Sequence, residues 1–358
     1  MIIVNARFLT QSMTGVQRFA VEICLELKKL FGEQLKFVAP DAIVLKGYAE
    51  ALGVEVIGTH QGHLWEQWDL PRYLRMQGSP LLLCLCNTAP LCYKNKVVTV
   101  HDVAFEAYPQ TFSKSFLYVY KFMIPRIMRS AKKVITVSEF SKDEIVKYYG
   151  ISRDKIAVVY NAVGDDFKKV EDDELQKQKY LLAVSSLNYR KNFLAVLEAF
   201  DIFEKENNDT SLYIIGDLKN SNFKGIDIER YRQNPSIKFL GRVSDTDLVR
   251  YYSNASAFVY PSIYEGFGIP PLEAQTCGCP AICADASCLP EVFGDSVLYC
   301  NPYDPMSLMD KIKRIATDEL LRETLIRKGI KNLQRYSNFI DCNNFRRCYT
   351  IYVKRIKN

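Results

Sequence analysis

The stretch AFVYPSIYEGFGIPPLE, residues 257–273, decides the fold class of the chain. Its first four residues, 257–260, are all apolar or aromatic, as is typical of a parallel strand buried on both faces. Gly266 and Gly268 then flank Phe267 and allow backbone conformations that other residues resist. The two prolines that follow suit the first turn of a helix. The stretch therefore predicts a strand, a glycine loop and a helix, the repeating unit of an α/β fold with parallel sheets.

A junction of this kind is a binding site for an anion, because backbone N–H groups and the positive end of the helix dipole point toward the loop. Two carboxylates, Glu265 before the helix and Glu273 inside it, can accept hydrogen bonds from sugar hydroxyls. A ligand with a central diphosphate and a hydroxylated ring at each end would satisfy the whole site, and nucleotide sugars have that structure. The expected donor contacts in this stretch are Glu265, Gly266, Phe267, Gly268, Ile269, Leu272 and Glu273.

The order of these residues resembles a known family. Glu265 and Glu273 enclose Gly-Phe-Gly, and Cys-Gly-Cys-Pro-Ala-Ile at 277–282 and Leu-Pro-Glu-Val at 289–292 follow them. Two glutamates alone would indicate only a solvated helix start. The complete pattern resembles the signature of the retaining nucleotide-sugar glycosyltransferases of the group-1 class, family 4. The resemblance implies the GT-B fold, in which two Rossmann-like parallel-sheet domains face each other across a cleft.

The composition is that of a globular protein long enough for two domains. Of the 358 residues, 48% are hydrophobic and 25% are charged, which is ordinary for such proteins. No apolar run reaches the roughly 18 residues of a membrane helix, and the N-terminus lacks the features of a signal peptide. We therefore expect a cytoplasmic protein, and no nucleic-acid partner. The resemblance implies an acceptor-binding domain at 1–164, joined by a final helix at about 339–358, and a nucleotide-sugar-binding domain at 165–338.

Most of the net charge of +6 lies in the first half of the chain. Residues 1–165 hold 20 Lys and Arg against 15 Asp and Glu, which leaves 27 against 26 for the rest. Within that half, residues 112–129 place apolar side chains on one side of a helix and basic ones elsewhere. Two interpretations stay open: peripheral association with an anionic membrane surface at the inner face of the cell membrane, or a core helix with a solvated basic face.

Two motifs in the first half carry candidate residues. The loop at 12–18 joins the first expected strand to a helix, and such turns lie at the carboxyl edge of a sheet, where ligands bind. Its resemblance to the family's Gly-x-x-Arg loop implies that Gly15 approaches the diphosphate or the acceptor. His101 ends the apolar run 97–100. Its resemblance to the family's His-Asp-x-x-Phe motif implies a hydrogen bond to the donor sugar, and a histidine that only caps the strand is the alternative.

The second half supplies two adjacent cations, Arg190 and Lys191, after the apolar run 180–184. An arginine can hold a diphosphate by a forked contact and a lysine as a point charge. The resemblance of Arg-Lys-Asn to a family motif implies that the pair stabilises the leaving nucleotide. The loop at 242–244 resembles the one that contacts the nucleobase through its backbone, which adds Val243 to the donor-binding residues.

We expect no metal and no cofactor apart from the donor substrate. Eleven cysteines are an odd number without paired Cys-x2-Cys spacing, which favours buried thiols over a metal centre or disulfides. Asp-Thr-Asp at 245–247 fits the first turn of a helix, where acids favour the dipole. Two further elements are expected: one amphipathic helix between His63 and Leu74, and a helix that Ser141 and Glu144 cap as a capping box and that ends near Gly150.

The sequence thus predicts a retaining hexosyltransferase of surface polysaccharide biosynthesis. It would move a hexose from a nucleoside-diphosphate sugar to a hydroxyl of a glycan or lipid-linked oligosaccharide without a metal. The Gly-x-x-Arg and Trp-Glu-Gln features resemble those of mannosyltransferases, which favours GDP-mannose. Two alternatives stay open: a nucleotide-sugar epimerase of the same fold, and an inactive subunit that binds a nucleotide sugar. The expected catalytic residues are His101, Arg190, Lys191 and Glu265.

Overall fold

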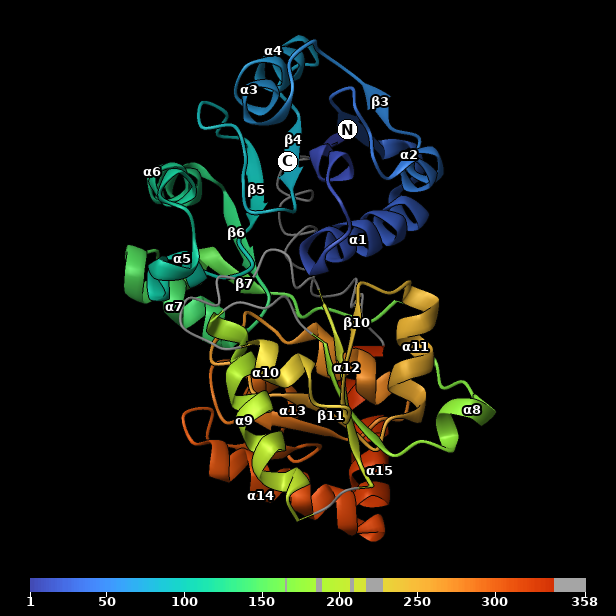
Figure 1. Ribbon diagram of the computed structural model, residues 1–358. Helices are drawn as coiled ribbons and strands as arrows, with labels where there is room; N and C mark the ends of the chain where they lie inside the picture. The colour runs from blue at the N-terminus through green and yellow to red at the C-terminus, as the bar shows by residue number, and fades with distance from the viewer. Residues whose placement is uncertain (165, 185–188, 207–208, 217–227, 338–358) are drawn as a thin grey trace. The chain divides into compact units, whose positions relative to one another are not determined.

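The computed structural model divides the chain into two compact units, the first ending at Ala162 and the second beginning at Val163 (Figure 1). It describes residues 1–164, 166–184, 189–206, 209–216 and 228–337. Each unit consists of one parallel sheet with helices packed against it, so the predicted α/β class with two Rossmann-like parallel sheets is confirmed. The final helix expected at 339–358 lies outside the described residues. Among the helices that the structure describes, none has the length and apolarity to cross a bilayer.

The sheet of the first unit has seven parallel strands in the order β3-β2-β1-β4-β5-β6-β7. The strands between the two edges are buried without alternation, as expected for a sheet covered on both faces, whereas both residues of the edge strand β3 are exposed. Their order reverses between β1 and β4, and the crevice at the carboxyl ends of such a pair is where ligands bind in this architecture. The strands are β1 (Ile2–Asn5), β2 (Leu35–Ala39), β3 (Glu55–Val56), β4 (Leu81–Cys84), β5 (Lys96–Thr99), β6 (Lys133–Thr136) and β7 (Ile156–Val158).

Helices cover both faces of this sheet, with α1 and α2 on one side and α3, α4 and α6 on the other (Figure 1). Phe19, Ile23 and Leu27 recur at helical spacing on α1 and are buried, so this face of α1 packs into the core. The helices are α1 (Gly15–Phe31), α2 (Lys46–Leu52), α3 (Gly62–Gln67), α4 (Asp69–Met76), α5 (Ala104–Ala107), α6 (Lys114–Ser130) and α7 (Glu139–Tyr149).

Two sequence expectations about these helices were wrong in detail. The single helix expected between His63 and Leu74 is two helices, α3 and α4, which meet at Trp68. The cause is Pro71, which has no N–H to donate to a continuous helix and is tolerated in the first turn of a new one.

The start of α7 also differs from the expectation. Its cap is Ser138, whose hydroxyl accepts from the backbone N–H of Ser141 at 3.0 Å, so Ser141 and Glu144 do not form the expected capping box. The predicted end is confirmed, because Gly150 terminates α7 with a left-handed φ of 63°.

The sheet of the second unit has six parallel strands in the order β10-β9-β8-β11-β12-β13, and its order reverses between β8 and β11. The strands are β8 (Tyr180–Val184), β9 (Ser211–Ile215), β10 (Ile237–Gly241), β11 (Ala257–Tyr260), β12 (Ala281–Ala284) and β13 (Leu298–Cys300). The helices are α8 (Asp173–Gln176), α9 (Phe193–Glu204), α10 (Ile228–Arg232), α11 (Asp245–Asn254), α12 (Ile269–Thr276), α13 (Leu289–Phe293), α14 (Pro305–Thr317) and α15 (Glu319–Ser337).

Lys96 is a cation buried inside the first unit. Its ammonium donates to the carbonyl of Pro90 at 2.6 Å and to the hydroxyl of Ser130 at 3.0 Å, and its side chain has no exposed surface. Burial lowers the pKa of Lys96 from 10.5 to about 8. The unfolded chain therefore holds this proton more tightly than the native protein. The charged lysine costs stability below pH 8, and that cost disappears as the pH rises to about 10.5.

We expect the free energy of unfolding of the wild type, measured relative to Lys96→Met, to rise by about 3 kcal/mol between about pH 7 and pH 11. Urea denaturation at successive pH values measures the difference. Lys94→Met, which removes an exposed lysine two residues away, is the matched control and should give a constant difference. A constant difference for Lys96→Met as well would contradict the lowered pKa.

Candidate active site

The decisive stretch of the sequence lies at the point where the strand order of the second sheet reverses. β11 ends at Tyr260, the loop 261–268 follows, and α12 begins at Ile269. Gly268 is the residue before the helix and has a left-handed φ of 93°, so the predicted strand, glycine loop and helix are confirmed. The start of α12 therefore lies at the carboxyl edge of the sheet, where Ile269 carries the one backbone N–H of the first three helical residues because Pro270 and Pro271 have none.

Glu265 is the best-anchored acid of this loop. Its Oε1 accepts from the Lys191 ammonium at 2.6 Å, from the Tyr260 hydroxyl at 2.8 Å and from the Ser262 hydroxyl. Among the described residues, Oε2 accepts no hydrogen bond, so one oxygen holds the side chain in place and the other is left for a ligand. Burial alone would raise the pKa of Glu265, but the charges of Lys191 and Arg190 bring it below its ordinary value. The group is a carboxylate at neutral pH.

Arg190 and Lys191 lie on a short 3-10 turn, Tyr189–Lys191, after β8. The carbonyl of Arg190 accepts from the N–H of Ile263 at 2.7 Å and from the Ser262 hydroxyl at 3.0 Å, so the loops after β8 and β11 are joined directly. Lys191 donates to Glu265 and to the Tyr260 hydroxyl, the latter at 2.9 Å. Lys191 is thus partly neutralised by an acid that the sequence did not pair with it.

Glu273 lies on α12 and is 7% exposed. Its Oε2 accepts from the Tyr252 hydroxyl at 3.4 Å, and burial and the charge of Glu273 raise the pKa of that tyrosine. Two other expected donor contacts, Phe267 and Leu272, bury their side chains in the core, where Phe267 packs edge-on against Tyr336 at 5.5 Å. Their side chains are therefore not available to a ligand.

Val243 was also predicted to contact the donor, but it does not lie beside the acids and cations described above. It lies half-buried between β10 and α11, and β10 is separated from β8 by β9. In the described part of the chain, Val243 shares no hydrogen bond with Glu265, Glu273 or the cations.

The candidates of the first unit are placed by β4, β5 and α1. His101 follows β5 and is buried, which lowers its pKa and keeps the imidazole neutral. Its Nε2 lies 2.9 Å from the carbonyl of Leu85 and therefore carries the proton, so Nδ1 is left as an acceptor. The backbone N–H of His101 donates to Asn87 Oδ1 at 2.9 Å. Gly15 is the first residue of α1.

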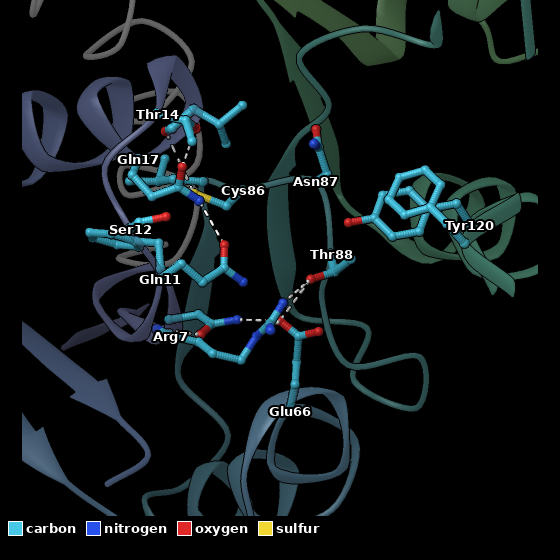
Figure 2. A pocket seen from close by; sticks show the side chains of 15 residues that line it. Arg7, Gln11, Ser12, Thr14, Gln17, Glu66, Cys86, Asn87, Thr88 and Tyr120 are labelled. Carbon is cyan, nitrogen blue, oxygen red and sulfur yellow. Dashed lines mark hydrogen bonds and ion pairs between the residues drawn. The ribbon is translucent and has the colours of Figure 1, made fainter. Parts of the chain in front are cut away.

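The sequence did not predict a polar pocket of about 590 Å³ in the first unit (Figure 2). The pocket contains a buried ion pair between Arg7 and Glu66, whose Nε and Oε1 lie 3.4 Å apart. The sequence analysis singled out two of its segments, the loop 12–18 and Trp-Glu-Gln at 65–67, but nothing in either motif indicates that they meet at one pocket. In the second unit, Tyr260, Ser262 and Tyr252 were missed as well, although Ser262 stands three residues before Glu265 in the quoted stretch.

Two family models match consecutive parts of the chain. The model described as glycosyl transferases group 1 matches residues 165–332, and the model described as glycosyltransferase family 4 matches residues 13–167. Together they cover most of the described residues of both units.

The chain is similar to O-antigen chain mannosyltransferase B of Escherichia coli, with 31% identity over 257 residues, which are 67% of this chain and 66% of that protein. It is 29% identical to the O-antigen chain mannosyltransferase RfbU of Salmonella typhimurium over 335 residues, 88% and 90% of the two chains. Sucrose-phosphate synthase from Thermosynechococcus elongatus has a similar structure, with a TM-score of 0.75, 17% identity and 99% and 98% coverage. The glycosyltransferase WaaG also has a similar structure, with a TM-score of 0.69 and 15% identity over 95% of this chain and 96% of that chain. At these identities the two structures show the shared GT-B fold alone.

Proposed function

The chain belongs to the group-1 glycosyltransferases of family 4, a retaining class, and on that premise we propose that it transfers a hexose from a nucleoside-diphosphate sugar to a hydroxyl of a glycan or lipid-linked oligosaccharide. The observation that carries the proposal is the anchored carboxylate of Glu265, with two cations and a helix start beside it. GDP-mannose is the proposed donor and surface polysaccharide the proposed product, because the two relatives described above are O-antigen mannosyltransferases.

The proposed chemistry uses charge stabilisation and needs no metal. The bond between the sugar C1 and the diphosphate oxygen breaks, C1 bonds to the acceptor oxygen on the same face, and the leaving diphosphate takes the acceptor's proton. Arg190, Lys191 and the start of α12, with the N–H of Ile269 and the positive end of the helix dipole, stabilise the negative charge that collects on the diphosphate. Such preorganised donors often supply the greater part of an enzyme's rate enhancement.

The remaining residues position the donor. Oε2 of Glu265 accepts from a hydroxyl of the transferred sugar, and Glu273 holds the ribose hydroxyls. Nδ1 of His101 accepts from a further sugar hydroxyl, and Gly15 lets the backbone approach the diphosphate or the acceptor. Val243 contacts the nucleobase through its backbone, as the family resemblance implies.

An assay of donor cleavage tests this proposal. The full chain is incubated with GDP-mannose and with UDP-, ADP- and dTDP-hexoses, and nucleoside diphosphate release and the sugar product are followed by NMR. Release of GDP from GDP-mannose is the expected result. Inversion at one ring carbon without release would favour the epimerase, and binding of a donor without any reaction would favour the inactive subunit.

We also propose that α6 binds an anionic membrane surface, where a lipid-linked acceptor would be held. Tyr118 is 80% exposed and Phe122 47%, and the Arg126 guanidinium lies 3.8 Å from the centre of the Phe122 ring. Lys114 and Lys121 are exposed on the same helix. An aromatic stripe flanked by basic residues is typical of helices that lie in a membrane interface.

Sedimentation with vesicles containing phosphatidylglycerol measures this binding. We expect the double variant Tyr118→Ser, Phe122→Ser to bind about tenfold more weakly, because two interfacial anchors are lost. Met306→Ser with Leu320→Ser, which changes two exposed apolar residues of the second unit, is the matched control. Equal binding by both double variants would refute the role of α6.

A further inference from the structure

The pocket of the first unit lies where a ligand site is expected in this sheet. Asn5 ends β1, and Leu85 to Thr88 follow β4, so the pocket opens at the reversal of strand order between these two strands. Its volume of about 590 Å³ falls within the roughly 300–1,000 Å³ typical of small-molecule sites. Figure 2 shows the side chains of α1, α3, α6 and the loop after β4 converging on it.

A buried ion pair, Arg7 with Glu66, forms one wall. Oε1 of Glu66 accepts from the Asn5 amide at 2.7 Å and from the Thr88 hydroxyl at 3.1 Å, as well as from Arg7. Nη2 of Arg7 donates to the Thr88 hydroxyl at 2.8 Å. Burial alone would raise the pKa of Glu66, but the nearby His63 imidazole, the charge of Arg7 and the donors Thr88 and Asn5 hold it below the ordinary value, so both members are charged.

Some polar atoms at the pocket make no hydrogen bond to any residue that the structure describes. Glu66 is 1% exposed, and its Oε2 accepts no hydrogen bond from any described residue; the nearest basic group is the His63 imidazole, with Nδ1 at 3.6 Å. Nη1 of Arg7 and the Tyr120 hydroxyl, both at the pocket, likewise have no hydrogen-bond partner in the described ranges. Of these atoms, Glu66 Oε2 is the one that is buried without a hydrogen-bond partner among the described residues. Such an atom is costly, so a ligand that supplies a hydroxyl group to it would be stabilised here.

The opposite wall is aromatic. Phe116 and Tyr120 stack with ring centroids 3.8 Å apart at an angle of 21°, and the Tyr120 hydroxyl points into the pocket (Figure 2). A sugar ring has apolar C–H faces and a polar edge of hydroxyls. A pocket with an aromatic wall on one side and a fixed set of donors and acceptors on the other is complementary to such a ring.

The charge of the pocket restricts the ligand further. Of the 15 side chains that line it, only Arg7 and Glu66 are charged, and they neutralise one another. An anionic ligand would find no unneutralised cation and would face the Glu66 carboxylate. An uncharged ligand meets no such penalty.

The pocket also shares its wall with His101. The carbonyl of Leu85 and the side chain of Asn87, both lining the pocket, accept from the His101 imidazole and backbone N–H. Whatever fills the pocket therefore lies one residue layer from the histidine proposed to contact the transferred sugar.

We propose that this pocket binds the terminal sugar of the acceptor, that this sugar is an uncharged hexose, and that Arg7 and Glu66 determine specificity by contacting its hydroxyls. The inference rests on the proposed function for the identity of the ligand as the acceptor.

Binding of methyl α-D-mannopyranoside, methyl α-D-glucopyranoside and methyl α-D-galactopyranoside to the full chain, followed by titration in ligand-observed NMR, tests the proposal. We expect at least one to bind, and Tyr120→Phe and Glu66→Gln each to weaken it about tenfold. Tyr120→Phe removes only a hydroxyl that makes no hydrogen bond to the described residues, so it keeps the test valid if Glu66→Gln fails to fold. Tyr148→Phe and Glu144→Gln, outside the pocket, are the matched controls.

In the transfer reaction the same variants should raise KM for the methyl hexoside about tenfold and KM for the nucleotide sugar by less than threefold. The proposal is overturned if no methyl hexoside binds, if methyl glucuronate binds more tightly, or if the pocket variants bind as the controls do. If the variants weaken hexoside binding but the protein cleaves no nucleotide sugar, the pocket is confirmed as a sugar-binding site and the proposed transfer reaction is refuted.

Discussion

Lys191→Met is expected to lower kcat/KM for transfer by roughly 10²–10³-fold, which corresponds to about 2.7–4 kcal/mol of transition-state stabilisation. Lys191 anchors Glu265 at 2.6 Å and is proposed to stabilise the leaving diphosphate, so one substitution removes a cation and releases an acid. Glu265→Gln should have an effect of similar size, because it keeps the shape of the side chain and leaves Lys191 without its counter-ion.

The double variant distinguishes a shared role from two separate ones. If Lys191 and Glu265 act as a unit, Lys191→Met with Glu265→Gln should lose far less than the product of the single losses. Steady-state kinetics with the cleaved donor measures all three variants. Lys205→Met, which removes the exposed partner of Asp201, is the matched control in the same unit. Multiplicative losses would show that the two residues contribute independently.

Gly268→Ala is expected to reduce the free energy of unfolding by about 2–5 kcal/mol, the sum of left-handed strain and overpacking. At a φ of 93° an added Cβ would lie 2.7 Å from Leu289 Cδ2 and 3.3 Å from Phe293 Cε2, both in the core. Because Gly268 precedes the first turn of α12, the folded fraction of the variant should also bind the donor more weakly.

Gly150→Ala separates the two causes. Gly150 lies in the same left-handed helical region, with a φ of 63° and a ψ of 26°, but an added Cβ would meet nothing within 4 Å. Its loss should therefore be about 1–2 kcal/mol, from backbone strain alone. Urea denaturation of both variants gives the comparison, and equal losses would exclude the contact with Leu289 as a cause.

The local structure around the candidate site of the second unit could be predicted because the stretch is contiguous in sequence. A strand, two glycines, two prolines and an acid before the helix fix the local structure of 257–273 with little help from distant residues. The pairing of Lys191 with Glu265 could not be predicted, since no local pattern tells which two loops of a parallel sheet become neighbours. That contact depends on β8 and β11 lying side by side.

The pocket of the first unit could not be predicted either, because its residues come from segments that are even farther apart in the sequence. Asn5, Glu66 and Thr88 are each unremarkable in their own segments, and their hydrogen bonds span 61 and 22 residues of chain. Glu66 fits the polar side of an amphipathic helix, and that pattern says nothing about a distant partner. Where local rules compete, as at Ser138 and Ser141, either serine could cap a helix, and the end of the preceding strand decides between them.

The break between α3 and α4 has a spectroscopic consequence. The protein has two tryptophans, Trp65 and Trp68, and they stand on either side of Glu66 and close to that break. Trp65 is fully buried and donates from its indole to the carbonyl of Ile57 at 2.7 Å, whereas Trp68 is 64% exposed. Intrinsic tryptophan emission therefore arises from the first unit alone, with a blue, quencher-resistant component and a red component that iodide removes. Unfolding of the second unit alone would therefore not change the tryptophan emission.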